Sequence, residues 1–333
     1  MKFNLFDVPV EPIGGKKFIY GQIMDWIVDK KVFDFDLMTN LSKKVRQELH
    51  DNYIVSKLKL VTKQIDKDDG TIKFLFSLSD NITVESVMIP SKDHYTACVS
   101  TQAGCAVGCR FCATGQGGVG RNLHFGEIIM QFLTMEKEIS QRISHVVFMG
   151  MGEPFHNYEN SKLAVRFLQE SKLNISARRI TVSSVGFPDK IKQWADEGVR
   201  SELAISLHSA IEFKRRELIP YAKLCSIPEL MDAINYHFLK TKRLPTFEYV
   251  MLQGVNDGVD DLNALVRLVR NIDCKINLIA MNGSTNGFVS PDRDAIKKFC
   301  KQLNENRVKA TLRRSAGANI FAACGQLKAQ SKL

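Results

Sequence analysis

From about residue 96 onward, short apolar runs alternate with longer amphipathic segments, and this alternation constrains the fold more than any other feature of the sequence. The short runs are apolar almost throughout, which is typical of strands buried on both faces of a parallel sheet. The longer segments between them predict crossover helices and therefore an α/β fold. The expected strands lie at 97–101, 145–150, 180–185, 202–208, 247–252, 276–282 and 308–314. The expected helices lie at 126–140, 158–172, 188–198, 227–239, 258–271 and 292–303.

Repetition of this unit about six times suits a barrel or a partial barrel, although a doubly wound open sheet shares the pattern. In either architecture the carboxyl ends of parallel strands meet at one edge of the sheet. Functional side chains are therefore expected in the loops that follow the strands.

The residues before 96 follow two other patterns. Between Tyr20 and Tyr53 apolar side chains recur at helical spacing, which predicts a small helical module. Residues 56–90 alternate between apolar and polar, with the turn sequence DKDDG at 66–70, and so predict a short β segment. We therefore expect an accessory domain over 1–95, a βα domain over 96–314 and a C-terminal segment over 315–333.

Charge and composition indicate a folded, basic protein. The 46 Lys and Arg residues exceed the 36 Asp and Glu residues and give a net charge of +10, which favours a polyanionic partner without establishing one. No apolar run of about 18 residues is present, and the amino terminus lacks the pattern of a signal peptide. We expect no membrane span and a cytoplasmic, reducing location.

The cysteines are clustered. Eight in 333 residues are too sparse for a disulfide scaffold, yet four of them fall within fifteen residues. In a reducing compartment such clustering indicates metal or redox chemistry. Cys105, Cys109 and Cys112 form a C-x3-C-x2-C loop directly after the first expected βα strand, and three thiolates so close can converge on one metal centre.

A 4Fe-4S cluster and a zinc ion are the two centres that this loop could hold. A structural zinc ion takes four ligands, and the nearest additional candidates are Cys98 and His124. A 4Fe-4S cluster with three protein ligands keeps one iron open for another molecule. The spacing favours the cluster, and a zinc site or inert thiols are the alternatives.

A second motif, Gly150-Met-Gly152-Glu153-Pro154, follows the next expected strand. Glycines let the backbone approach a ligand, and Glu153 offers an acceptor for an ammonium group. A glycine-rich turn after a strand is common for structural reasons alone. Its position one βα unit after the cysteine loop favours a ligand-binding role over a purely structural one.

Together these motifs resemble the radical S-adenosylmethionine (SAM) superfamily, with Phe111 as the aromatic residue before the third cysteine. Further segments narrow the resemblance to the RlmN and Cfr family of RNA adenosine methyltransferases. These segments are 84–87 (VESV), 98–105 (CVSTQAGC), 121–123 (RNL), 149–154 (MGMGEP), 206–208 (SLH) and 322–327 (AACGQL). The helical residues near the amino terminus are similar to the accessory domain of that family, so the resemblance runs nearly end to end.

The resemblance implies a radical SAM partial (βα)6 barrel with a small N-terminal helical accessory domain that contacts RNA. The ligands of a 4Fe-4S cluster would be Cys105, Cys109 and Cys112. The contacts to SAM map onto Gly152, Glu153, Ser183, Ser206, Leu207, His208 and Asn282.

The resemblance also implies a reaction that uses two SAM molecules per turnover. The first methylates Cys324 in the mobile C-terminal segment, and the second is cleaved to a radical that removes hydrogen from this S-methyl group. The methylene radical adds to adenine, Glu85 matches the acceptor of the ring proton, and Cys98 matches the thiol that releases the product as a transient Cys98–Cys324 disulfide. We expect Cys225, Cys274 and Cys300 to be structural thiols.

By the same resemblance, the substrate is adenine carbon 2 in 23S rRNA, with tRNA as a further candidate. The close alternative is Cfr-like methylation at carbon 8, which confers antibiotic resistance, and the alternative from another class is a non-catalytic zinc-containing RNA-binding protein. The implied partners are RNA and an electron donor such as flavodoxin or ferredoxin with its reductase, and we expect a monomer. Candidate RNA contacts are the basic clusters at 178–179, 214–216, 240–243 and 313–314.

One segment departs from the family pattern. Upstream of Cys324 many relatives have acidic residues in a Gly-Asp-x-Ile-x-Ala-Ala-Cys sequence, whereas this chain has Gly317-Ala318-Asn319. The departure leaves every catalytic group in place and puts the substrate position in question.

Overall fold

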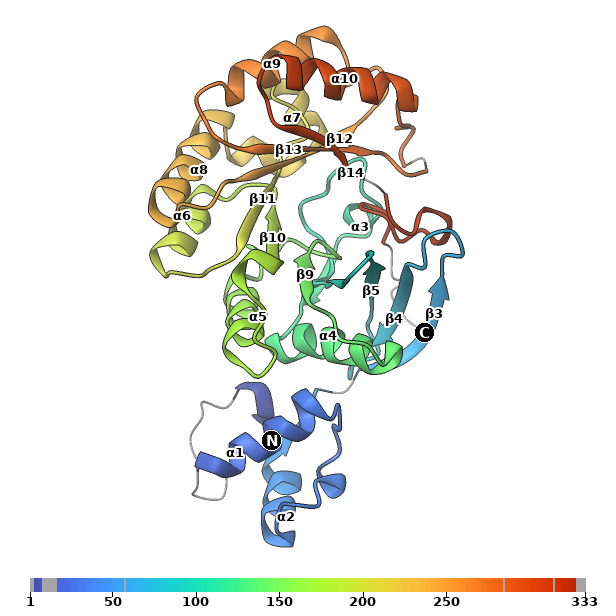
Figure 1. Cartoon of the computed structure of the whole chain (residues 1–333), viewed down its shortest axis with the longest axis vertical. Helices are drawn as coiled ribbons and strands as arrows, with labels where there is room; N and C mark the ends of the chain where they lie inside the picture. Colours follow the sequence, from blue (N-terminus) through green and yellow to red (C-terminus); the bar gives the residue numbers. More distant parts are fainter. Residues whose placement is uncertain (1–2, 8–16, 57, 284, 314, 328–333) are drawn as a thin grey trace.

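The computed structural model describes all residues except 1–2, 8–16, 57, 284, 314 and 328–333. Within the described residues, its centre is a ten-stranded sheet in the order β14-β13-β12-β11-β10-β9-β6-β5-β4-β3 (Figure 1). The strands from β6 to β14 are parallel and follow chain order. They are β6 (Tyr95–Cys98), β9 (His145–Phe148), β10 (Ile180–Ser184), β11 (Glu202–Ser206), β12 (Thr246–Met251), β13 (Lys275–Ala280) and β14 (Ala310–Arg313).

Helices cross over between successive parallel strands and cover the outer face of the curved sheet (Figure 1). Their starts follow local capping rules: Ser226 caps α8 with a reciprocal bond from Glu229, and Asp292 caps α10. A doubly wound sheet requires a point at which the strand order reverses, and the order of these parallel strands never does. The predicted partial barrel of six βα units is therefore confirmed. The helices are α4 (Phe125–Ile139), α5 (Tyr158–Glu170), α6 (Pro188–Asp196), α7 (Glu212–Leu218), α8 (Ile227–Thr241), α9 (Val259–Val269) and α10 (Arg293–Glu305).

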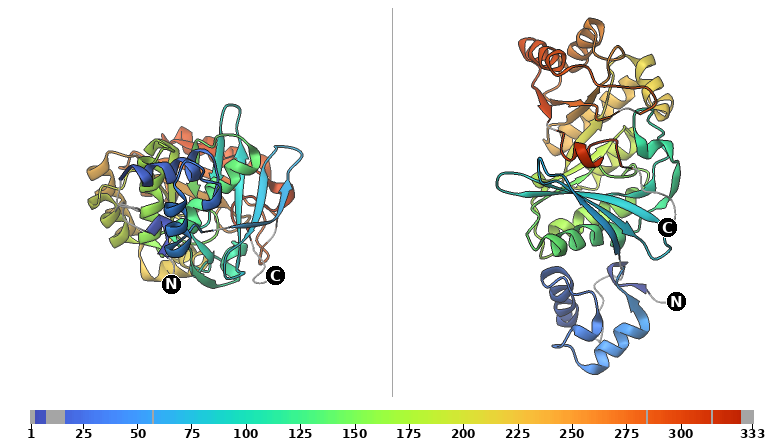
Figure 2. Two further views of the ribbon diagram at one scale, coloured as in Figure 1. Left: turned by 90° about the horizontal axis from the view of Figure 1, so that it is seen from below. Right: turned by 90° about the vertical axis from the view of Figure 1, so that its right-hand side faces the viewer.

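The N-terminal residues form a separate small body at one end of the molecule, beside α4 and α5 (Figure 2). Phe6 packs edge-on against Phe125 of α4 and Phe167 of α5, with ring centroids 5.9 and 5.6 Å away. Lys31 pairs with Glu136 of α4 at 2.6 Å. The regular elements of this N-terminal body include β1 (Phe3–Asn4), α1 (Lys17–Met24), a π-helical turn (Asp25–Asp29), a 3-10 turn (Phe35–Leu37), α2 (Lys43–Asn52) and β2 (Tyr53–Ile54).

The β segment expected over 56–90 is present as three antiparallel strands, β3 (Lys59–Ile65), β4 (Ile72–Ser77) and β5 (Thr83–Pro90). These strands extend the barrel sheet, because β5 pairs with β6 and sets Val87 opposite Cys98. The division of the chain at residue 95 stays a prediction.

The structure differs from the expected elements in a few places. β6 ends at Cys98 rather than at 101, because the Thr101 and Gln102 amides donate to the Met151 carbonyl and the chain then forms β7 (Gln102–Gly104). β7 pairs with β8 (Val119–Asn122) around the short helix α3 (Ala113–Gln116), and none of these elements was predicted, nor was α7. Arg314 and residues 328–333 of the expected C-terminal segment lie outside the described residues. No helix among the described residues is long and apolar enough to cross a membrane.

Candidate active site

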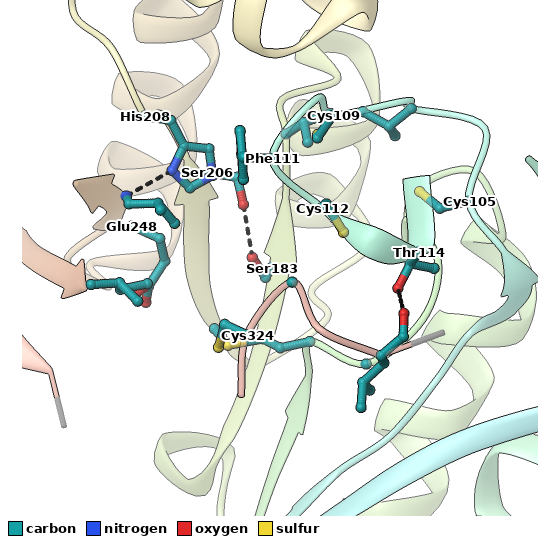
Figure 3. Close-up of a pocket in the computed structure, with 18 of the residues that line it drawn as sticks. Cys105, Cys109, Phe111, Cys112, Thr114, Ser183, Ser206, His208, Glu248 and Cys324 are labelled. Atoms are coloured by element: carbon teal, nitrogen blue, oxygen red, sulfur yellow. Dashed lines mark hydrogen bonds between the residues drawn. The ribbon is translucent and has the colours of Figure 1, made fainter. Parts of the chain in front are cut away.

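The carboxyl ends of the parallel strands open into one pocket (Figure 3). The loop cysteines occupy one side of it, Ser206, His208 and Glu248 occupy the other, and Cys324 enters from the C-terminal segment. The predicted site residues that line the pocket are Cys105, Cys109, Cys112, Gly152, Glu153, Ser183, Ser206, His208, Asn282 and Cys324. Leu207 is fully buried outside this lining, Cys98 lines an adjoining cavity, and Glu85 lies outside the lining of both.

The cysteine loop is held by backbone contacts and by a small apolar core of its own. The Cys105 amide donates to the Gly118 carbonyl at 2.8 Å, and the Arg110 amide donates to the Leu218 carbonyl at 3.0 Å. Val107 and Phe111 of the loop pack among Leu218, Ile219 and Ala222. These contacts fix the loop against α7 and the turn that follows it, and the three cysteine side chains pack against the same apolar core.

The three loop sulfurs are not all as close together as the ligands of one zinc ion. Among the described residues, only Asp34, Asp36 and His50 bring three metal-ligand atoms within 4.8 Å of one another. At least one pair of loop sulfurs is therefore farther apart than that, whereas sulfur ligands of one tetrahedral zinc ion lie about 3.8 Å apart.

The buried guanidinium of Arg215 lies behind this loop. Arg215 is 1% exposed, and its Nη2 donates to the Val185 carbonyl while Nε and Nη1 have no hydrogen-bond partner. Burial lowers the pKa of Arg215, whereas the neighbouring Cys225, Glu212 and, least, Cys109 act in the opposite direction. A buried cation whose charge is only partly compensated is costly, and thiolates bound to a metal cluster would add negative charge beside it.

Glu153 is a buried carboxylate at the end of β9. Its two oxygens accept hydrogen bonds from the amides of Phe155 at 3.0 Å and Val185 at 2.9 Å, but burial outweighs these bonds and raises its pKa to about 7. Gly152 has φ +100°, and a Cβ there would lie 2.7 Å from the Gln102 backbone nitrogen. The turn therefore requires glycine, and Glu153 lacks only a cationic partner such as an ammonium group.

Ser183, Ser206 and His208 face the pocket from the ends of β10 and β11. The two serine hydroxyls are 3.5 Å apart. His208 accepts at Nδ1 from the Val250 amide at 3.0 Å, and burial lowers its pKa to about 3. The imidazole is thus neutral with its proton on Nε2, which leaves a donor for a ligand. Its ring packs edge-on against Phe111, with the centroids 4.7 Å apart.

Asn282 follows β13 and contacts the segment that carries Cys324. Its side chain donates to the Ser315 hydroxyl at 3.0 Å, and its carbonyl accepts from the Gln326 side chain at 3.2 Å. The residue therefore lines the pocket and also holds the C-terminal segment over it.

A smaller cavity beside the pocket is lined by both Cys98 and Cys324. Burial and, to a lesser extent, the neighbouring Cys324 raise the pKa of Cys98 to about 12, while the Arg313 guanidinium acts in the opposite direction. Among the described residues lining this cavity, Arg313 is the only charged one. Its Nη1 lies 3.6 Å from the Glu248 carboxylate, so the guanidinium connects the two thiols with a buried acid.

Glu85 lies on β5. Because successive side chains of a strand point to opposite faces, residues 85, 87 and 89 share one face of the sheet. Val87 and Ile89 line the thiol cavity, so Glu85 shares the face that looks toward it. Its Oε1 lies 3.4 Å from the Lys73 ammonium, and its carbonyl accepts from the Ser100 hydroxyl at 2.5 Å. Its assignment as proton acceptor stays a prediction.

The sequence analysis missed Glu248 and Lys73, and it took Arg215 and Arg313 for candidate RNA contacts. A signal was present for two of them: Glu248 and Arg313 stand inside apolar runs that were expected to be buried strands. Arg215 is wrong as an RNA contact because it is buried. Lys214 pairs with Asp261 at 2.8 Å and the exposed Arg216 pairs with Glu212 at 2.8 Å, and their contact with RNA stays a prediction. Arg313 is a site residue rather than a surface residue.

Comparison with known proteins matches both parts of the chain. Residues 6–55 match the Ribosomal RNA large subunit methyltransferase N-terminal domain, and residues 99–269 match the Radical SAM superfamily. A probable dual-specificity RNA methyltransferase RlmN from Thermotoga maritima is 46% identical over 98% of this chain and 97% of its own length. This chain belongs to the RlmN family of radical SAM RNA methyltransferases. Its RlmN relative from Staphylococcus saprophyticus is 42% identical over 96% of this chain and 89% of the relative.

A solved structure agrees with this RlmN assignment. The crystal structure of a radical SAM methyltransferase from Sphaerobacter thermophilus is 38% identical to this chain, with a TM-score of 0.93 over 98% of this chain and 100% of that one. Radical SAM enzymes use a 4Fe-4S cluster and SAM. The residues present fit both groups, because the loop offers spaced thiols backed by an unpaired guanidinium and Glu153 offers a carboxylate for an ammonium. Family membership therefore decides against the non-catalytic zinc-binding alternative.

Proposed function

We propose that this RlmN family member methylates carbon 2 of an adenosine in 23S rRNA, with tRNA as its second substrate and an S-methylated Cys324 as the carrier. The observation that supports the carrier role is the position of Cys324, which reaches the pocket of the cysteine loop from a segment more than 200 residues away in sequence. The names of the relatives support the substrates, because they are described as dual-specificity RNA methyltransferases.

In this proposal the loop cysteines hold the cluster, and Glu153 binds the ammonium group of SAM. Ser183, Ser206 and the Nε2 proton of His208 line the remainder of the SAM site. When bound, the cluster supplies the electron that cleaves SAM, and the cleavage product activates the S-methyl group by removing a hydrogen atom. An electron donor such as flavodoxin or ferredoxin with its reductase is therefore needed, and the enzyme works as a monomer.

The two thiols then divide the remaining steps. Cys324 would carry the carbon to the base. The Cys98 thiolate would then attack the Cys324 sulfur, so that the S–S bond forms as the S–C bond breaks, and the carbon leaves with the electron pair and takes up a proton to become the methyl group. Such an attack needs a thiolate, and Arg313 is the group that opposes the effect of burial on Cys98. Glu85, on the same face as the thiol cavity, accepts the proton from the ring carbon.

We infer that RNA reaches the pocket along a groove at the end of the barrel where the parallel strands begin. Met149, Glu248 and Arg313 line both this groove and the pocket, so the two adjoin. Arg178 and Lys242 are exposed at the groove, together with Lys275. Cations at a groove of this kind favour phosphate contacts, which give affinity and strong salt dependence without sequence information.

Mass spectrometry of rRNA and tRNA digests tests the proposal directly. Cells that lack the protein should lose 2-methyladenosine from 23S rRNA and from tRNA, and the purified enzyme should restore both. Appearance of 8-methyladenosine instead would establish the Cfr-like alternative. A Cys324→Ala variant that still methylates RNA would contradict the carrier role.

A further inference from the structure

The C-terminal segment reaches the pocket across the tip of the β3–β4 hairpin. Figure 1 shows this segment beside β3 and β4, far from both in sequence. The Gly317 amide donates to the Asp69 carboxylate at 3.0 Å, and the Asn319 amide donates to the Asp66 carboxylate at 3.2 Å. The Asn319 side chain adds bonds to Asp66 at 3.0 Å and to Asp68 at 2.8 Å. The acidic turn thus binds the backbone and one side chain of the segment.

The contact is close-packed as well as hydrogen-bonded. Gly317 has φ +68°, and a Cβ there would lie 2.7 Å from Ala322 Cβ and 2.8 Å from Thr71 Cγ2. Only glycine fits this conformation and this space together. Thr71 follows the acidic turn directly, so the same hairpin supplies both the acceptors and the packing surface.

The charges of the two partners are complementary in this chain. The hairpin turn offers three carboxylates, and amide groups of the segment donate hydrogen bonds to them. Hydrogen bonds from Asp68 and Asn319 lower the pKa of Asp66, so it accepts as a carboxylate. An acidic residue at position 319 would lose two donors and face Asp66 and Asp68 with like charge. The absence of acids at 318 and 319 therefore matches the acidic turn opposite them.

A second anchor lies on the other side of Cys324. The Ala113 amide donates to the Gly325 carbonyl at 2.7 Å, and the Thr114 hydroxyl donates to the Leu327 carbonyl at 2.5 Å (Figure 3). These donors belong to α3, which begins directly after Cys112. Cys324 is therefore suspended between the acidic turn and the helix that follows the cysteine loop.

Lys73 connects the first anchor with the predicted proton acceptor. Its ammonium lies 3.4 Å from the Glu85 carboxylate and 3.5 Å from the Phe321 carbonyl. One cation thus contacts both the acid on β5 and the segment that carries Cys324.

We propose that the Asp66–Asp69 turn is a docking site that holds the Cys324 segment in place beside Cys98, with Asn319 as its main ligand and Lys73 as the tie to Glu85. These are positioning residues, and their importance for methylation rests on the proposed function of Cys324. The docking itself is a property of the protein without any bound group.

The test is an Asn319→Asp variant of the full-length protein, with Asn306→Asp as the matched control. Asn306 also donates from its side chain, but to Gln302 at the end of α10, away from the turn. Amide hydrogen exchange over residues 315–323 should speed up by about tenfold in the first variant and stay unchanged in the control. Equal exchange rates in the variant and the wild type would overturn the docking site.

A glutathione redox buffer measures what docking does for the two thiols. One oxidised glutathione takes two electrons from Cys98 and Cys324, which close a disulfide and release two reduced glutathiones and no other product. Docking raises the effective concentration of Cys324 at Cys98, so Asn319→Asp should lower this equilibrium constant by about tenfold. An unchanged or higher constant would show that docking does not bring the thiols together.

Reversal of the pair provides the rescue. Asp66→Asn combined with Asn319→Asp exchanges the donor and the acceptor. On a logarithmic scale, the double variant should recover at least half of the decrease in the disulfide equilibrium constant that Asn319→Asp alone causes. Lys73→Met should lower the same constant by about threefold, while Lys73→Arg keeps the cation and the wild-type value. A double variant no better than Asn319→Asp alone would contradict a direct Asp66–Asn319 contact.

The failure of this proposal is separable from failure of the proposed function. If Cys324→Ala still methylates RNA while Asn319→Asp speeds amide exchange, the docking site stands and the carrier role falls. If Cys324→Ala abolishes methylation while Asn319→Asp changes neither the exchange nor the disulfide constant, the carrier role stands and the docking site falls.

Discussion

The cysteine loop and the Cys324 segment bring thiols to the same pocket, but they are held in different ways. Residues 105–112 are fixed by backbone bonds and by packing of Val107 and Phe111 in a small apolar core. Residues 315–327 are held by carboxylates of the β3–β4 turn, of which Asp66 is buried and Asp68 is exposed, and by donors of α3, while Cys324 itself is exposed.

This difference teaches what each thiol can do. A loop anchored by its backbone keeps its cysteines in place while a bound group is present or absent, as a fixed set of metal ligands requires. A segment anchored by a small number of hydrogen bonds can leave and return, since each such bond contributes only about 1 to 3 kcal/mol. A carrier that meets a methyl donor, a base and Cys98 in turn needs that freedom.

The largest expected effect separates the two regions completely. Cys112→Ala should abolish iron binding and, with it, both SAM cleavage and RNA methylation. Cys324→Ala should bind iron normally and still cleave SAM, but RNA methylation should fall by at least about a thousandfold because the carrier is gone. Iron analysis, 5′-deoxyadenosine assay and RNA mass spectrometry measure the three properties, and a loss of iron in Cys324→Ala would erase the distinction.

A second effect concerns Cys98, the thiol that is expected to attack Cys324. Cys98 has a pKa raised to about 12 by burial, so between pH 7 and 9 its thiolate fraction grows about tenfold per pH unit. Its attack on a mixed disulfide of Cys324 with glutathione should accelerate in proportion.

Arg313 opposes the effect of burial, so its removal raises the pKa of Cys98 further. Arg313→Met should slow the attack by about tenfold at neutral pH, since part of the lost thiolate is offset by higher nucleophilicity. Stopped-flow measurement with Arg313→Lys as the charge-preserving control checks this. Equal rates in Met and wild-type proteins would mean that the guanidinium does not act on the thiol.

The two regions also differ in how far the sequence could predict them. The cysteine loop and the Gly152-Glu153 turn are local motifs that follow buried strands, and parallel topology alone brings them to one edge. Strand periodicity likewise predicted the barrel and the strands over 56–90. These features depend on near neighbours in the chain.

The docking of residue 319 on residue 66 depends on a contact across 253 positions, and no pattern in either segment encodes it. The same holds for Arg215, which reads as one cation in a basic run and is buried because α7 turns it inward. Charge counts cannot distinguish a solvated Arg from a buried one, which is why Arg215 was misjudged. Tertiary packing decides both cases.

A third effect should have opposite signs with and without iron. Arg215→Met removes a buried cation whose Nε and Nη1 lack partners, so the metal-free protein should be unchanged or more stable by about 1 to 2 kcal/mol. The loaded protein loses the positive charge beside the thiolates, so iron should escape to a chelator about fivefold faster. Urea unfolding and iron release measure the two, and destabilisation of the metal-free protein would contradict the role assigned to Arg215.

The smallest expected effect tests whether the close fit at Gly317 matters beyond its backbone angle. Gly317→Ala places a Cβ against Thr71 and Ala322, whereas Gly287→Ala imposes a similar positive φ, +80° against +68°, with nothing within 4 Å. The angle alone costs about 1 kcal/mol at either position. Only Gly317→Ala should lower the Cys98–Cys324 disulfide constant, by about threefold, and neither variant should change iron binding. Parallel loss in both variants would mean that the segment responds to general strain, and the contrast between a fixed loop and a docked segment would lose its structural basis.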